Sequence, residues 1–178
     1  MHINDWDDRF LSKFSPTDYV NNLKKAGAES TVLYAHSHVG LTNYPTQHGQ
    51  MHRGLRGRDI FSEVAVACRR EGIAVQLYFS LIFDTWAYRN HPDWRIRNYD
   101  GSGVADKSRY GVCCPNSPYR LYVKKMIEEF CRRLEFDGVR FDMTFWPTVC
   151  FCPWCRERFS KETGHELPTE INWEDSLW

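Results

Sequence analysis

Short runs of hydrophobic residues mark the strands that this chain predicts. Residues 31–35 and 73–79 are largely apolar and rich in β-branched and aromatic side chains, and 138–142 is a shorter run of the same kind. Such runs are typical of parallel strands that are buried on both faces of a sheet. A further short strand around Ile3 is a weaker prediction, because few residues support it.

Helical spacing fills the segments between these strands. Hydrophobic residues recur every three or four positions after Ser15, after Asp59 and after Ser117. A Ser or Asp in such a place is a suitable N-cap, and Gly27 and Gly72 are natural ends for the first two helices. The pattern therefore predicts helices that begin near residues 15, 59 and 117.

The lengths of the connections favour a barrel. Helices return to strands through short turns, whereas long loops, 36–57 and 80–116, follow two of the strands. In a (β/α)₈ barrel the active site is built from the loops at the carboxyl ends of the strands, which explains this asymmetry. A doubly wound open sheet is the alternative, but no Gly-rich phosphate loop follows any strand.

The number of strands predicts only part of a barrel. The fold class expected for residues 1–178 is α/β, as the N-terminal half of a (β/α)₈ TIM barrel and one partial catalytic domain of about four strand–helix units. Half a barrel would leave two strand edges unpaired, which is a liability in water. We expect the second half to come from further sequence or from another chain, as in a homo-oligomer.

Charge and composition exclude several classes of partner. Lys plus Arg and Asp plus Glu both number 23, so the formal net charge is zero and no field favours nucleic acid or an anionic membrane. No apolar run reaches the roughly 20 residues of a membrane span. The N-terminus shows no signal-peptide pattern. Seven cysteines, an odd number, suit a metal site in a reducing compartment, so the expected location is cytoplasmic.

Aromatic residues are abundant, with 7 Trp, 9 Tyr and 11 Phe. Rings in excess of what a core needs often line carbohydrate sites, because a ring face packs against the apolar face of a pyranose. A large aromatic core explains the same count equally well. Composition alone leaves both interpretations open.

The sharpest motif is the group Cys150, Cys152 and Cys155. Three thiolates within six residues can converge on one ion, and Zn²⁺ prefers four sulfur or nitrogen ligands in a tetrahedron. The candidates for the fourth ligand are, in order of preference, Cys114, Cys113 and His165. A zinc held in this way would be structural and would take no part in the chemistry. The alternative is three unliganded thiols in a loop.

Asp142 is the candidate catalytic residue. It stands at the predicted carboxyl end of the last strand, where the catalytic groups of barrels concentrate. Strand alternation puts it on the same face as Arg140, whose charge would keep it ionised and suited to act as a nucleophile. The alternative is a structural ion pair between the two. Glycoside cleavage usually needs a second carboxylate, for which Asp84, Asp5 and Asp7 are weaker candidates than a residue in the second half of the barrel.

His36 and His38 follow the strand predicted at 31–35, and their role has two interpretations. Two histidines at this spacing could ligate a metal, but no matching set of His or Asp follows the later strands. We therefore favour His38 as a contact to a sugar hydroxyl and His36 as its support. The expected substrate-binding residues are His38, Tyr44, His52, Tyr78, Trp86 and Arg140.

Two segments resemble known glycoside hydrolases. The segment 33–46, which contains His38 and Gly40, and the segment 136–142 look like parts of the α-L-fucosidase-like and hypothetical glycosyl hydrolase barrels. In the fucosidases the aspartate at the end of the second segment is the nucleophile. The resemblance therefore implies a TIM barrel with Asp142 in that role.

The cysteine pattern is similar to the zinc site of the family-42 β-galactosidases. There, four cysteines in these places hold a structural zinc, which implies the ligands Cys114, Cys150, Cys152 and Cys155. The chain departs from that family at 141–143, where the β-galactosidases have an Asn-Glu pair. Their acid/base residue is therefore not inherited.

The function expected from the sequence is a retaining glycoside hydrolase, α-L-fucosidase-like or β-galactosidase-like, with a carbohydrate substrate and Asp142 as nucleophile. One alternative is a non-catalytic carbohydrate-binding or degenerate barrel. A second alternative is a metal-dependent hydrolase that uses His36 and His38. Because the second carboxylate is not evident, this chain alone is expected to be inactive.

Overall fold

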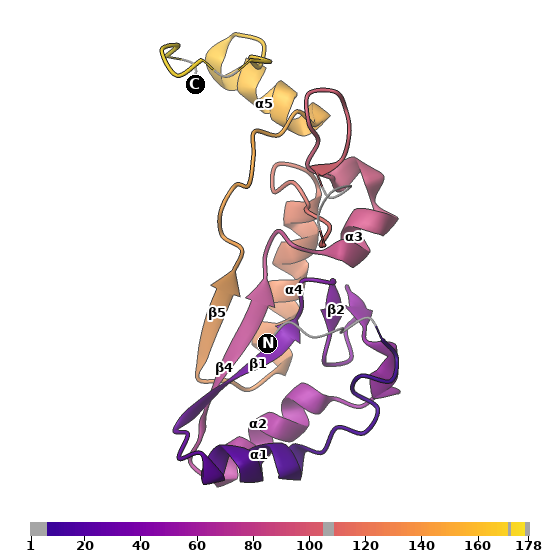
Figure 1. Ribbon diagram of the computed structural model, residues 1–178, viewed down its shortest axis with the longest axis vertical. Coiled ribbons are helices and arrows are strands. Elements are labelled where there is room, and N and C mark those ends of the chain that lie inside the picture. Colours follow the sequence, from indigo (N-terminus) through magenta and orange to yellow (C-terminus); the bar gives the residue numbers. More distant parts are fainter. Residues whose placement is uncertain (1–6, 105–108, 171, 177–178) are drawn as a thin grey trace.

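Three parallel strands form the centre of the fold. The structure, a computed structural model, describes residues 7–104, 109–170 and 172–176 of the chain. β1 (Ser30–His36), β4 (Ala74–Ser80) and β5 (Gly138–Asp142) lie side by side, with β4 in the middle (Figure 1). The three strands predicted from the hydrophobic runs are confirmed, whereas the strand expected around Ile3 lies outside the described residues.

A helix precedes each of these strands and makes the parallel order possible. α1 (Pro16–Lys25) precedes β1, α2 (Ile60–Arg70) connects β1 to β4, and α4 (Tyr119–Arg133) connects β4 to β5. The Ser15 side chain accepts a backbone N–H at the start of α1 at 3.2 Å, and Asp59 caps α2 in the same way at 2.9 Å. The predicted helices are therefore confirmed, together with the first two caps.

The segments between and after these strands contain further elements that hydrophobic periodicity did not predict. The remaining elements are β2 (Leu41–Thr42), β3 (Gln50–Met51), the 3₁₀ turns Arg53–Leu55 and Pro92–Trp94, α3 (Thr85–Asn90) and α5 (Pro153–Thr163). β2 pairs antiparallel with the end of β1, so the sheet order is β3-β2-β1-β4-β5. In the described part of the chain, every helix is too short or too polar to cross a membrane.

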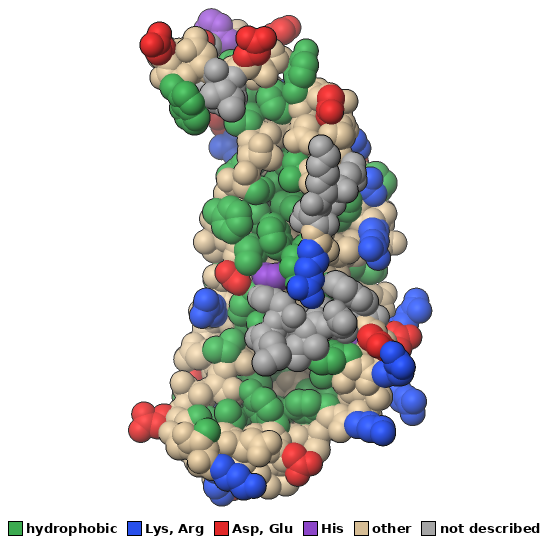
Figure 2. Space-filling view, viewed as in Figure 1, with side chains coloured by type: hydrophobic (Ala, Val, Ile, Leu, Met, Phe, Trp, Pro, Cys, Tyr) green, Lys and Arg blue, Asp and Glu red, His purple; other side chains and the backbone are tan. Residues whose placement is uncertain are grey.

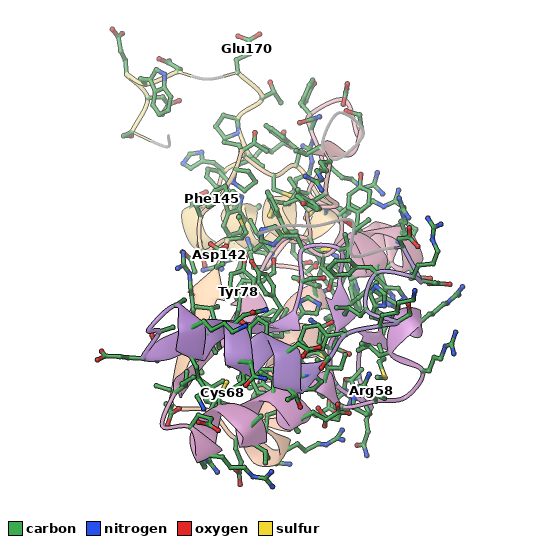
Figure 3. The ribbon with its side chains drawn as sticks, turned by 60° about the horizontal axis from the view of Figure 1, so that its bottom comes forward. Arg58, Cys68, Tyr78, Asp142, Phe145 and Glu170 are labelled. Carbon is green, nitrogen blue, oxygen red and sulfur yellow. The ribbon has the colours of Figure 1, made fainter. Side chains whose placement is uncertain are left out.

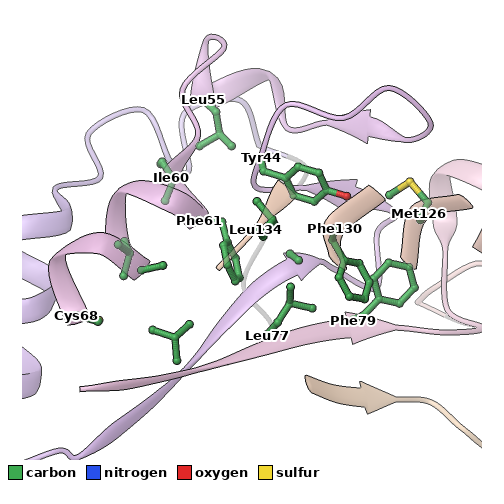
Figure 4. Close-up of a cluster of buried hydrophobic side chains, with 14 of the residues drawn as sticks. Tyr44, Leu55, Ile60, Phe61, Cys68, Leu77, Phe79, Met126, Phe130 and Leu134 are labelled. Atoms are coloured by element: carbon green, nitrogen blue, oxygen red, sulfur yellow. The ribbon is translucent and has the colours of Figure 1, made fainter. Parts of the chain in front are cut away.

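One face of the sheet packs on the helices and forms the main core. Leu77 and Phe79 of β4 lie between the sheet and the helices, with Phe61 of α2 and Phe130 of α4 beside them, and all four are buried (Figure 4). The ring centroids of Phe79 and Phe130 are 5.5 Å apart. Because buried apolar surface contributes about 25 cal/mol per Å², this layer fixes the helices against the strands.

The opposite face and the outer edge of β5 are less covered. Val32 on β1 is 41% exposed and Phe141 on β5 is 42% exposed, although both are large apolar residues of strands. Among the strands that the structure describes, β5 pairs with β4 alone. Three parallel strands with helices on one face and a free edge form part of a (β/α) barrel, in agreement with the expected fold class.

Candidate active site and metal centre

The carboxyl ends of the parallel strands bring a carboxylate and a phenol together. Asp142 ends β5 and is directly paired in the sheet with Ser80, which ends β4. The Tyr78 hydroxyl donates a hydrogen bond to Asp142 Oδ2, and the Met143 backbone N–H donates to Oδ1 at 2.9 Å. Figure 3 shows Tyr78 and Asp142 next to each other at the ends of the strands, with Phe145 beyond them.

These donors keep the Asp142 carboxyl group ionised. The hydrogen bond from Tyr78 is the main cause that lowers the pKa of Asp142, and the Met143 N–H and the charges of His38 and Arg140 add to it against the opposing effect of desolvation. Burial and the neighbouring carboxylate raise the pKa of Tyr78, so its hydroxyl stays protonated and remains a donor. An ionised carboxylate is suited to nucleophilic attack rather than to proton donation.

His38 extends this network from the loop after β1. Its Nδ1 lies 2.7 Å from Ser80 Oγ, and the Ser80 hydroxyl donates to the Phe83 carbonyl oxygen at 2.8 Å. Because the single hydroxyl hydrogen of Ser80 is used there, His38 Nδ1 carries a hydrogen and donates it to Oγ. His38 Nε2 faces the Tyr78 hydroxyl oxygen at 3.4 Å. The buried His38 ring is thus fixed beside the pair of Tyr78 and Asp142.

Three further rings form an aromatic wall beside this network, namely Phe83, Tyr110 and Phe145. Phe83 and Tyr110 meet the His38 ring edge-on at centroid distances of 5.4 and 5.1 Å, and Phe145 lies 6.2 Å from Phe83. Phe145 and the adjacent Trp146 are 53% and 47% exposed. Hydrophobic side chains gather on this part of the surface, above the ends of the strands (Figure 2). These rings were not among the residues predicted from the sequence, although Phe83 and Phe145 each stand three residues after a strand end.

The structure separates the predicted substrate-binding residues into two groups. Tyr44 is fully buried in the main core, where its hydroxyl donates to a buried glutamate at 3.4 Å. His52 is buried and caps a 3₁₀ turn, and Trp86 packs from α3 against the main core. The residues on the same face as Asp142 are His38, Tyr78 and Arg140.

The weaker candidates for a second carboxylate do not face a substrate. Asp84 is fully buried and caps α3, where it accepts a backbone N–H at 2.7 Å. Asp7 is partly exposed and pairs with a neighbouring arginine at 2.8 Å, and Asp5 lies outside the described residues. Among the described residues, therefore, neither Asp84 nor Asp7 supplies an acid partner for Asp142.

His36 supports the strand ends from inside the protein. It has no exposed surface, its Nδ1 lies 3.2 Å from the Ser80 carbonyl oxygen, and its Nε2 lies 3.4 Å from the Asp84 carboxylate. Within the described residues, neither His36 nor His38 belongs to a group of three potential metal ligands close enough for one ion. The alternative of a metal held by His36 and His38 therefore lacks a third ligand among the described residues.

Four buried cysteines converge beyond the ends of β4 and β5, and we call them the cysteine cluster. They are Cys114, Cys150, Cys152 and Cys155, and their sulfur atoms all lie within 4.8 Å of one another. Cys114 Sγ is 3.4 Å from Cys155 Sγ and 3.7 Å from Cys152 Sγ. A tetrahedral zinc with Zn–S bonds of about 2.3 Å places its sulfurs about 3.8 Å apart. The cluster therefore fits one such ion.

The fourth sulfur of the cluster comes from Cys114 rather than from the other two candidates. The buried Cys113 thiol points to the Asp84 carbonyl oxygen at 3.7 Å, and His165 is exposed. Hydrogen bonds from the neighbouring sulfurs, Cys114 first, hold the pKa of Cys150 far below its ordinary value. The same contacts with the other three sulfurs raise the pKa of Cys114, so the sulfurs share protons unevenly when no ion holds them. A bound metal would take all four as thiolates.

The fold and the comparisons with known proteins together define part of a barrel of glycoside-hydrolase type. A family model described as Hypothetical glycosyl hydrolase 6 matches residues 15–143, which is more than half of the chain and includes Asp142. The chain belongs to this family. A search of the curated proteins found no match.

Solved structures share the fold. Alpha-L-fucosidase isoenzyme 2 from Paenibacillus thiaminolyticus has a TM-score of 0.80 at 23% identity, over 91% of this chain and 25% of that one. A hypothetical protein from Ruminiclostridium thermocellum ATCC 27405 has a TM-score of 0.61 at 14% identity, over 81% and 76%. The Thermotoga maritima alpha-fucosidase in complex with fucose has a TM-score of 0.57 at 21% identity, over 88% and 34%. At such identities the likeness shows the fold alone, and the chain spans about a quarter of the first of these proteins.

Proposed function

We propose that this chain is the catalytic N-terminal half of a retaining glycoside hydrolase, with Asp142 as the nucleophile. The observation that carries the proposal is the ionised Asp142, held by Tyr78 and the Met143 N–H at the carboxyl end of β5. Catalytic groups of barrels concentrate at that place. Membership of a glycosyl hydrolase family supports the same class of reaction.

In the proposed reaction an oxygen of Asp142 bonds to the anomeric carbon of the sugar while the glycosidic C–O bond breaks. A general acid gives its proton to the leaving oxygen, and a covalent glycosyl ester of Asp142 remains. The conjugate base of the general acid then takes a proton from a water molecule. The oxygen of this water attacks the anomeric carbon and releases Asp142. We expect this acid/base residue on a strand of the barrel beyond β5.

The proposed substrate is a carbohydrate, with an α-L-fucoside as first choice and a β-galactoside as second. The first choice is supported by the resemblance of segments 33–46 and 136–142 to fucosidases and by the likeness of fold to an alpha-fucosidase in complex with fucose. The aromatic wall supports a sugar, because ring faces pack against its apolar C–H groups. His38 would contact a hydroxyl group.

The test compares Asp142→Asn with Asp93→Asn in the complete protein. We expect Asp142→Asn to lower kcat/KM on aryl fucosides and galactosides by about 10⁴-fold or more, as removal of a nucleophile does elsewhere. Asp93 is exposed, so Asp93→Asn is the matched loss of one charge and should keep full activity. Full turnover by a folded Asp142→Asn variant would refute the proposal.

A non-catalytic carbohydrate-binding barrel is the second candidate, favoured by the burial of Asp84 and the pairing of Asp7. Wild-type protein that binds the sugars in calorimetry but turns none of them over would support this candidate. The alternative that uses His36 and His38 makes a different prediction, because it needs a second, exchangeable metal for turnover.

We also propose that the cysteine cluster binds one structural Zn²⁺. Four thiolates complete a tetrahedron and leave no position for water or substrate, so the ion would brace the loops and take no part in the reaction. Elemental analysis of purified protein should give about one zinc per chain. A cluster of four thiols that could hold a metal suits a reducing compartment, which supports a cytoplasmic location.

We propose further that another part of the same protein, or a second copy of the chain, completes the barrel. The free edge of β5 and the exposed Val32 and Phe141 support this proposal. The molar mass of the complete protein in solution distinguishes the two sources, because a monomer indicates the same protein and a dimer indicates a second copy.

A further inference from the structure

A groove of about 500 Å³ lies between α5 and the segment that follows β5. Its lining combines apolar side chains, among them Trp146 and Leu167, with the polar side chains of Asn116, Arg158 and Glu162. None of these residues belongs to the site around Asp142. Ligand pockets of proteins have volumes of about 300–1,000 Å³, so the groove is large enough to hold a small molecule.

Trp146 gives the groove an open aromatic face. Its side chain is 47% exposed, although tryptophan is on average a well-buried residue. Large apolar residues that gather at the surface mark binding sites more often than single ones do, and Trp146 stands next to the exposed Phe145. The indole ring is therefore available to a ligand in the groove.

The polar side chains of the groove hold one another in place. Arg158 Nη1 donates to Asn116 Oδ1 at 2.8 Å, and Arg158 Nε donates to Glu162 Oε1 at 2.8 Å. Asn116 Nδ2 donates in turn to Cys155 Sγ at 3.3 Å, which connects the group to the cysteine cluster. A guanidinium has five N–H donors, and the two bonds that the structure gives Arg158 leave the others for a ligand.

The groove begins where the aromatic wall ends. Phe145 of that wall lies 6.2 Å from Phe83, and Phe83 lies 5.4 Å from the His38 ring, both measured between ring centroids. Trp146 is the next residue after Phe145, and consecutive Cα atoms are only about 3.8 Å apart. Figure 2 shows hydrophobic side chains on this face from the ends of the strands toward α5. A molecule that extends from Asp142 past the wall would therefore reach the groove.

We propose that this groove binds the leaving-group part of an oligosaccharide substrate. The inference rests on the proposed function and adds that the substrate has at least two sugar units. The first sugar would lie beside Asp142, His38 and Tyr78. The second would lie beyond the aromatic wall, with its C–H face on the Trp146 ring and its hydroxyl groups bound to Arg158 and Glu162.

The combination of groups in the groove favours a sugar over other ligands. A purely apolar ligand would bury the charged pair of Arg158 and Glu162 without giving it hydrogen bonds, which is costly. An anion would meet the Glu162 carboxylate directly beside the Arg158 guanidinium and be repelled. A neutral sugar suits both, because each hydroxyl group can accept from an N–H and donate to a carboxylate.

The experiment measures binding by calorimetry to the complete protein carrying Asp142→Asn, so that the probes are not cleaved. The probes are L-fucose with fucosyllactose, and galactose with lactose for the second choice of substrate. The longer sugar of a pair should bind more tightly, and Trp146→Ala should weaken its binding about tenfold, the size of one lost ring contact. Binding of the single sugar should not change, which also shows that the variant is folded.

Three further variants complete the comparison. Trp146→Phe should restore most of the affinity for the longer sugar, because it keeps a ring. Arg158→Lys keeps the charge but loses the planar fork, so it should weaken the longer sugar alone. Trp154→Ala is the matched control, since Trp154 is an exposed tryptophan of α5 that is not among the described residues of the groove, and it should bind as the parent does.

Turnover by the complete protein with Asp142 intact gives an independent measurement. Trp146→Ala should lower kcat/KM for fucosyllactose about tenfold and leave kcat/KM for fucosyl fluoride unchanged, because the leaving group of the fluoride is a single atom that does not reach the groove. Equal losses on both substrates would mean that Trp146 acts on the first sugar or on the fold, and unchanged values on both would mean that the groove binds no sugar. Either result would overturn the inference.

The outcomes separate this inference from the proposed function. Protein that binds the single sugars but gains nothing from the second unit refutes the groove alone. Protein that binds none of the four probes refutes the proposed substrates and the groove together. Full turnover by Asp142→Asn refutes the nucleophile and not the groove.

Discussion

Tyr78→Phe tests how much the hydrogen bond to Asp142 contributes. Tyr78 is buried, and its ring packs on Tyr34 at a centroid distance of 4.2 Å, so the phenyl ring of the variant keeps this packing. What is lost is the hydroxyl that donates to Asp142 Oδ2. A hydrogen bond to a charged group contributes about 1.5–3 kcal/mol, so the free energy of unfolding should fall by about that amount at neutral pH.

The loss should depend on pH with a defined sign. Because the folded protein lowers the pKa of Asp142 below its ordinary 3.8, the stabilisation is fully present above 3.8 and is lost as the pH falls through the lower folded-state value. The difference between wild type and Tyr78→Phe should therefore shrink at low pH. Urea unfolding followed by tryptophan fluorescence, at neutral pH and in steps below 3.8, measures it.

Tyr34→Phe is the control, since it removes a hydroxyl from the neighbouring ring on the same face. Its effect should be smaller and should not vary between pH 7 and the acid range. If Tyr78→Phe lowered the free energy of unfolding by the same amount at every pH, the hydroxyl would stabilise the packing and not the charged form of Asp142.

Two further substitutions test the metal centre and the loop after β1. Cys152→Ser should abolish zinc binding in elemental analysis and lower Tm, because a structural zinc carries on the order of 10 kcal/mol of binding free energy, whereas the exposed Cys131→Ser should change neither. Gly40→Ala should cost about 1–3 kcal/mol in urea unfolding, because the new Cβ would lie 2.0 Å from Asp84 Oδ1 at a φ of +80°. Gly27→Ala, with a φ of +65° and no atom within 4 Å, should cost less, and equal losses would contradict the assigned clash.

The hydrophobic pattern was sufficient for the strands and helices but not for the loops. Periodicity reports which face of an element is buried, and this information placed β1, β4, β5 and the helices between them. It contains nothing about the path of an irregular segment. β2 pairs with the end of β1 at His36 and Thr42, and the turn carries Tyr44 into the core instead of toward a substrate.

The same limit applies to the candidate site. Asp142 could be located from sequence because a strand end is a fixed place in a barrel. Cys114 was preferred to Cys113 and His165 as the fourth ligand, and the structure brings it to the other three sulfurs. Spacing alone could not settle this order, because it does not say which side chain turns toward the cluster. The wall residue Tyr110 was missed for a similar reason, since it comes from the middle of a long loop.

The hydrogen bonds around Asp142 also indicate what the rest of the proposed retaining site has to supply. They favour the ionised carboxylate, so Asp142 does not provide a proton at neutral pH. Tyr78 has a raised pKa and donates to Asp142, and the Ser80 hydroxyl donates to a carbonyl oxygen, so neither suits the role of acid. If Asp142 is the nucleophile, a second carboxyl group is needed about 5–5.5 Å away. The uncovered edge of β5 lies beside Asp142, and the next strand of a barrel would bring its own carboxyl end to the same mouth. In the part of the chain that the structure describes, β5 has a free edge and Asp142 has no acid partner. One further strand beside β5 would therefore meet both needs.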